Sequence, residues 1–146
     1  MLIQDLASAG SLPVLSEMLR FAGQRQRLLT HNIANMDTPD FRPLDASPAD
    51  FQNALRTAVE ARRARTGGER GEIDLVETGE VVRSSDGGMS LKPKTPSAGI
   101  LFHDRNNRDL ERMMQDLAEN GMVYRMTTDL MRRQGDLLRT AISQRV

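Results

Sequence analysis

Histidine and carboxylate side chains most often carry acid–base or metal chemistry, and this chain has only two histidines, His31 and His103. They lie in different segments, and no Asp or Glu stands at a helical metal-ligand spacing from either. The sequence also lacks the H-E-x-x-H, P-loop, G-x-G-x-x-G and G-x-S-x-G motifs. We therefore expect no enzyme, no metal site and no cofactor.

Two other patterns could suggest chemistry but have simpler interpretations. Asp37-Thr38-Pro39 contains the Asp-Thr pair of acid proteases, but Pro replaces the Gly that they need and no second copy occurs. A turn is favoured, because Asp bonds downstream backbone and Pro39 keeps Thr38 out of the helical region. The basic cluster at Arg20, Arg25 and Arg27 lacks interleaved aromatics. Since the net charge is zero, it favours a solvated or subunit-bridging face over nucleic-acid binding.

The composition indicates a chain that does not bury a dense core alone. Aromatic residues make up only 3% of its 146 residues, and cysteine is absent. Large rings supply much of a compact core, whereas Leu, Met, Ala and Val suit helix–helix seams. No segment reaches the roughly 18–20 apolar residues of a membrane span. The first ten residues do not resemble a secretory signal, so we expect any export to use another route.

A long helix is predicted from Ser11 to Asn35, with Pro13 in its first turn, where a missing N–H costs little. Apolar residues recur at steps of three and four, which makes one broad face apolar. The residues assigned to its packing face are Leu15, Leu19, Ala22 and Leu29. A specified turn should follow, in which the helix closes and the chain is redirected. The residues assigned to this turn are Asn32, Ile33, Asn35, Asp37, Thr38, Pro39 and Phe41.

The middle of the chain should begin with a second, shorter helix. Ser47 is suited to cap it, with Pro48 at its first position, and Gly67-Gly68 should end it. Seven of the eleven glycines lie in residues 66–103. Short β-type runs at Ile73–Val76 and Glu80–Arg83 predict either a small hairpin or a mobile insert that a partner orders.

The last helix is predicted from about 108 to 143, capped by Asn106 or Asn107. Its heptad period predicts a left-handed coiled seam. The residues assigned to this packing face are Leu110, Met114, Leu117, Gly121, Tyr124, Met131, Gly135, Leu138 and Ile142. The two glycines would let another backbone approach closely, or else would weaken or bend the helix. A second set lies off this stripe and should stay exposed until neighbouring subunits cover it: Met113, Met122, Met126, Leu130 and Leu137.

These elements predict a mainly α fold in which the long N- and C-terminal helices pair as an antiparallel coiled hairpin. The short helix and a polar, partly β or disordered middle segment lie between them. The expected segments are 1–45, helix and turn; 46–66, short helix; 67–105, variable insert; and 106–146, coiled helix. Segments 1–45 and 106–146 should form one helical core.

Stretches near both ends of the chain resemble the bacterial flagellar axial family. Asn32-Ile33-Ala34-Asn35 and the following Thr38-Pro39-Asp40-Phe41-Arg42 are similar to its N-I-A-N-x-x-T-P-G-Y/F-K/R signature. Asn106-Asn107-Arg108-Asp109-Leu110-Glu111 with Met114 resembles the start of the C-terminal helix in the proximal rod proteins. Asp40 stands where Gly is usual, but Asp tolerates the left-handed conformation, so the turn is expected to survive.

The resemblance implies a structural component of the basal-body rod, a hollow tube that crosses the periplasm and transmits torque. Implied partners are other rod subunits, the protein joining the rod to the inner-membrane ring, the flagellar export gate and further copies of the chain. It also implies type III export without a cleaved signal peptide. The alternative is a cytoplasmic helical adaptor or export chaperone, which would show similar heptads but would not need the Asn-Ile-Ala-Asn turn.

Overall fold

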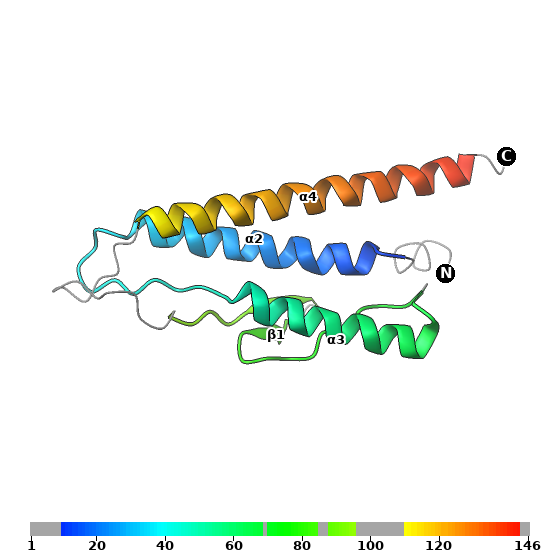
Figure 1. Ribbon diagram of the computed structural model, residues 1–146, viewed down its shortest axis with the longest axis horizontal. Coiled ribbons are helices and arrows are strands. Elements are labelled where there is room, and N and C mark those ends of the chain that lie inside the picture. The colour runs from blue at the N-terminus through cyan, green and yellow to red at the C-terminus, as the bar shows by residue number, and fades with distance from the viewer. Residues whose placement is uncertain (1–9, 69, 85–87, 96–109, 144–146) are drawn as a thin grey trace.

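A computed structural model describes residues 10–68, 70–84, 88–95 and 110–143. Three helices lie side by side in it, with α2 in the middle and α3 and α4 on either side (Figure 1). The terminal helices α2, Leu12–Ala34, and α4, Leu110–Ser143, run in opposite directions and pack against each other. The predicted antiparallel pair is thus confirmed. The capping asparagines assigned to α4 lie outside the described residues.

Helix α3 spans Pro48–Thr66 and has the ends that its sequence predicts. The Ser47 hydroxyl accepts a hydrogen bond from the Asp50 N–H, and Pro48 occupies the first turn. Gly67 ends the helix in the left-handed conformation, with φ of 72°, which glycine adopts without steric cost.

A two-stranded antiparallel sheet occupies part of the middle segment. Strand β1, Val81–Arg83, pairs with β2, Met89–Leu91, with Val82 opposite Ser90. The expected β-type run at Ile73–Val76 is not a strand. Ile73 and Leu75 instead pack their side chains against the hydrophobic core. Apolar and polar residues therefore alternate in this segment because one of its sides faces the core, although the segment is not part of the sheet.

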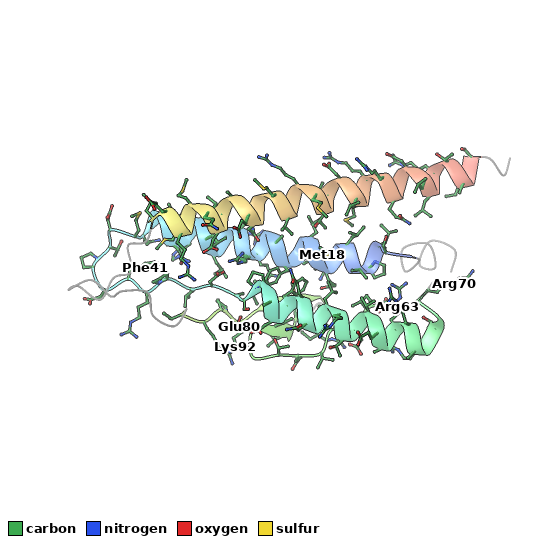
Figure 2. All side chains as sticks on the ribbon, viewed as in Figure 1. Met18, Phe41, Arg63, Arg70, Glu80 and Lys92 are labelled. Atoms are coloured by element: carbon green, nitrogen blue, oxygen red, sulfur yellow. The ribbon has the colours of Figure 1, made fainter. Side chains whose placement is uncertain are left out.

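The hydrophobic core lies between α2, α3 and the sheet. Phe21 and Phe51 stack with ring centroids 4.1 Å apart, and Leu55, Val81 and Met89 complete the cluster. Met18 on α2 (Figure 2) packs against this cluster. This cluster therefore contains residues from three of the four segments that the sequence predicts. The predicted boundaries between the segments stay a prediction.

Candidate functional site

The pair of terminal helices is held by residues at seven-residue intervals. On α2, the predicted packing residues Leu15, Ala22 and Leu29 are buried. On α4, the buried residues are Met113, Asn120 and Thr127. This is the heptad spacing of a coiled seam, with two of its three α4 positions polar.

Asn120 is the central polar residue of this seam, with only 3% of its surface exposed. Its side-chain amide donates hydrogen bonds to the Ala22 carbonyl at 2.9 Å and to Gln26 Oε1 at 2.6 Å. A buried Asn that is satisfied by the facing helix fixes the register of two helices at some cost in stability.

The structure places the residues assigned to the packing face in three groups. Leu15, Ala22 and Leu29 are buried. The partly buried members are Leu19, Leu117, Gly121, Met131, Gly135 and Leu138. The exposed members are Leu110, Met114, Tyr124 and Ile142. On α4, buried Met113 and Asn120 therefore each lie one position before the predicted Met114 and Gly121. The prediction missed this heptad because two of its members, Asn120 and Thr127, are polar, and an apolar pattern does not mark polar residues.

Gly121 and Gly135 leave open space beside α4. A Cβ atom built on either would meet no described atom within 4 Å other than those of its chain neighbours and of the surrounding helix backbone. Gly121 instead helps to line an open groove of about 740 Å³ between α2 and α4, with Gly23, Tyr124 and Arg125. The close approach of another backbone to these glycines stays a prediction.

The predicted turn after α2 is tied to the chain that follows it. Asn32 is 3% exposed, and its amide bonds both the carbonyl and the N–H of Leu44, at 2.8 and 3.0 Å. Asn35 bonds the His31 carbonyl with its side chain and so closes the helix. We expected Asn32 to close the helix as well. Its side chain instead holds the segment around Leu44 beside α2.

The remaining turn residues lie nearer the surface. The Ile33 carbonyl accepts a bond from the Met36 N–H, and the Thr38 carbonyl accepts one from the Phe41 N–H. Asp37, Thr38 and Pro39 are exposed, whereas half-buried Phe41 has its ring 5.5 Å from that of His31. Asp40 adopts φ of 59°, so the expected left-handed conformation is confirmed.

Arg25 joins the turn segment to both terminal helices. It is 6% exposed and makes a two-pronged bond to Asp45, with Nε–Oδ1 and Nη2–Oδ2 distances of 2.9 and 2.8 Å. Asp116 on α4 lies 3.8 Å away. The expected solvated or subunit-bridging role is therefore wrong for Arg25, because its charge is neutralised within the chain. Burial raises the pKa of Asp116, although the Arg25 charge opposes this.

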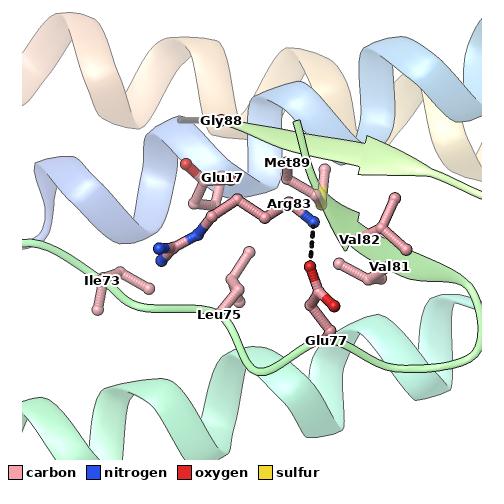
Figure 3. A pocket seen from close by; sticks show the side chains of 9 residues that line it. All are labelled: Glu17, Ile73, Leu75, Glu77, Val81, Val82, Arg83, Gly88 and Met89. Carbon is pink, nitrogen blue, oxygen red and sulfur yellow. Dashed lines mark hydrogen bonds between the residues drawn. The ribbon is translucent and has the colours of Figure 1, made fainter. Parts of the chain in front are cut away.

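A small cavity of about 20 Å³, enough for one water molecule, lies between α2 and the middle segment. Glu17 faces it from α2, and Ile73 and Leu75 face it from the other side, with Arg83 crossing between them (Figure 3). Glu17 Oε2 is buried, and no described group donates a hydrogen bond to it. Burial raises the pKa of Glu17, with Arg20 opposing.

One apolar surface of α4 has no partner among the described residues. Met122, Met126, Leu130 and Leu137 are 38–69% exposed, and their spacing of four, four and seven places them on one side of the helix. Their expected exposure in a single chain is thus confirmed. Met113 was expected to join them but is buried at 9%, because it shares the heptad of Asn120 and Thr127.

The described residues contain no group of three or more His, Asp or Glu side chains placed to hold a metal ion. Among those same residues, no helix has the length and apolar character needed to cross a membrane. The features that the structure does bring together are a helix pair, a fastened turn and an uncovered apolar stripe. Each of these is a feature through which helices and chain segments pack.

Comparison with known proteins reveals relatives that match most of this chain, although no protein-family model matches it. The flagellar basal body rod protein FlgB of Yersinia enterocolitica is 31% identical over 128 residues, which cover 83% of each chain. FlgB of Salmonella typhimurium is 30% identical over 75% of this chain and 76% of its own. FlgB of Bacillus subtilis is 26% identical over 92% and 95%. The chain therefore belongs to the FlgB family of flagellar basal body rod proteins.

Proposed function

We propose that this chain is a non-enzymatic subunit that builds the hollow proximal rod by packing its paired terminal helices against neighbouring subunits. The exposed stripe of Met122, Met126, Leu130 and Leu137 carries this proposal. An isolated soluble chain gains nothing from such a stripe, whereas its burial at a subunit contact would stabilise an assembly by about 25 cal/mol per Å².

Stiffness is the property through which such a rod would transmit torque. Interlocked helices resist bending because close-packed side chains cannot slide without losing contacts. In this chain, the seam at Asn120 and the Arg25–Asp45 pair would keep the helices and the turn in one arrangement under load. The turn residues from Asn32 to Phe41 would then present a fixed shape to the next subunit.

The proposal extends to partners and location. We expect contacts with other rod subunits, with the protein that joins the rod to the inner-membrane ring, and with the flagellar export gate during delivery. The rod would span the periplasm, and the chain would reach it by type III export without cleavage of a signal peptide. The family membership supports these expectations.

The proposal can be tested by replacing two stripe residues in a strain that carries no other copy of the gene. Met126→Gln combined with Leu130→Gln should reduce swimming at least tenfold, because both side chains lose apolar contact area at the subunit interface. The fold should persist, since both positions are exposed. Swimming-zone diameter and circular dichroism of the purified chain are the two measurements.

Arg132→Gln is the matched control, since it introduces the same side chain on the same helix. Its exposed ion pair with Asp129, at 3.7 Å, contributes little to stability. Normal swimming of the double variant, with the chain present in isolated basal bodies, would contradict the assembly role of the stripe.

A further inference from the structure

A groove lies where α2, α3 and α4 meet, beside Glu119, Asn120 and Val123 of α4. Its volume is about 220 Å³, and Phe21, Phe51, Leu55 and Val123 supply apolar walls. Glu119 lines the same groove and is exposed. The groove therefore combines apolar walls with one exposed carboxylate, and its other charged lining residue, Arg25, is paired with Asp45.

The C-terminal end of α4, called its far end below, has an exposed apolar side chain and a positive charge, which complement the groove. Leu137 is 65% exposed, and Arg133 lies one helical turn before it, on the same side of the helix. Helix α4 has 34 residues against 23 in α2, so it is longer by about 16 Å. Figure 1 shows its far end reaching past the start of α2 at Leu12.

Charge is also divided along α4. Residues 110–121 hold three carboxylates and one arginine, a net charge of −2. Residues 122–143 hold four arginines and two aspartates, a net charge of +2. Two copies placed head to tail bring opposite charges together, whereas two copies placed far end to far end oppose like charges.

We propose that the far end of α4 in one copy docks into the groove of the next copy, with Leu137 in the apolar interior and Arg133 beside Glu119. Leu137 cannot fill the groove of its own chain, because it lies fourteen residues from Val123, about 21 Å along a straight helix. A second copy is therefore the occupant that matches the groove in both apolar character and charge.

This contact joins two different surfaces, so it leaves a free groove at one end and a free helix end at the other. Such a heterologous contact can repeat along an open helical array. The inference rests on the proposed function, since it names the partner that covers part of α4. It adds the direction in which neighbouring copies face each other.

The absence of native cysteine allows a direct test with the full-length chain. Two purified single-cysteine variants, Gln52→Cys at the groove and Leu137→Cys at the far end, should form a mixed disulfide dimer when oxidised together. Thr57→Cys replaces Gln52→Cys as the control, since Thr57 is exposed on α3 without lining the groove. At least tenfold less dimer is expected with the control.

The charge contact is tested in the same assay. Glu119→Arg or Arg133→Glu alone should lower the yield of mixed dimer several-fold. Glu119→Arg on the groove chain with Arg133→Glu on the other should restore most of it, because the pair is then reversed. Circular dichroism of each variant excludes loss of fold as the cause.

Absence of the mixed dimer, equal yield with the control, or failure of the reversed charges to restore yield would each overturn this docking. Preferred self-linking of Leu137→Cys would also overturn it, in favour of a symmetric contact. The proposed function is judged separately, by whether the chain occurs in isolated basal bodies. Its presence there without this cross-link would reject the docking alone.

Discussion

Glu17 illustrates how a single buried charge can act against the fold. Its side chain lines the small cavity between α2 and the middle segment, its Oε2 atom is buried, and no described group donates a hydrogen bond to that atom. Burial raises the pKa of this carboxyl above its ordinary 4.5, so the folded state binds the proton more tightly than the unfolded state does. The charged form therefore costs stability at neutral pH, and the cost disappears as the pH falls through the raised pKa.

Replacement of Glu17 by Gln should therefore stabilise the protein at pH 7. We expect the free energy of unfolding to rise by about 1 kcal/mol, the lower end of the cost of a buried unsatisfied polar group. The gain should shrink as the pH is lowered and vanish below about 4.5, where Glu17 is neutral in both states. Urea unfolding at a series of pH values measures this difference.

Glu60→Gln, on the exposed side of α3, is the control and should change stability little at any pH. Among the described residues, the charged groups near Glu17 are Arg20 on α2 and Arg83 and Glu77 across the cavity. A loss of stability on Glu17→Gln at pH 7 would show that an ion pair with these arginines outweighs the cost of burial.

Among the elements, the turn after α2 depends on a side chain that reaches across it. Asn32 bonds both backbone groups of Leu44 and is buried. Asn35 makes one bond to the last turn of its own helix. The first asparagine therefore joins two segments, whereas the second only finishes one.

Asn32→Ala should lower the free energy of unfolding by about 2–3 kcal/mol, because it leaves two backbone groups of Leu44 without their partner. Asn35→Ala should cost less than about 1 kcal/mol, since water can replace an exposed bond. Urea unfolding gives both values, and faster amide exchange at Leu44 should accompany only the first change. Equal costs for the two variants would show that Asn32 does not fasten the turn.

For the whole molecule, the unequal lengths of α2 and α4 leave part of the longer helix without an α2 residue beside it. Its apolar stripe is exposed as well. Helix formation in water depends on packing of an apolar face. The end of α4 should therefore gain most of its stability when other copies cover it.

We accordingly expect both helicity and melting temperature to rise with protein concentration. Binding to the folded state stabilises it by mass action, so self-association makes melting concentration-dependent. Circular dichroism at 222 nm over a hundredfold range of concentration measures both quantities. Full helicity with a sharp melt that does not change over this range would contradict the prediction.

Local sequence was sufficient for much of this fold and for its turn. Ser47-Pro48 and Gly67 set the ends of α3, and Asn35 closes α2, because capping depends on residues a few positions apart. The positive φ of Asp40 followed from the same local logic. The apolar periods of the two long helices predicted their pairing and the exposed stripe on α4, since side-chain direction in a helix repeats with a fixed period.

The tertiary structure decided what depends on partners distant in sequence. A helical period marks apolar positions, so it could not reveal that Asn120 and Thr127 centre the seam, where polar atoms find acceptors on helical backbone. The burial of Arg25 required Asp45, which only the folded turn brings beside it. Burial and pairing of polar groups are properties of two surfaces in contact, and one segment of sequence describes only one of them.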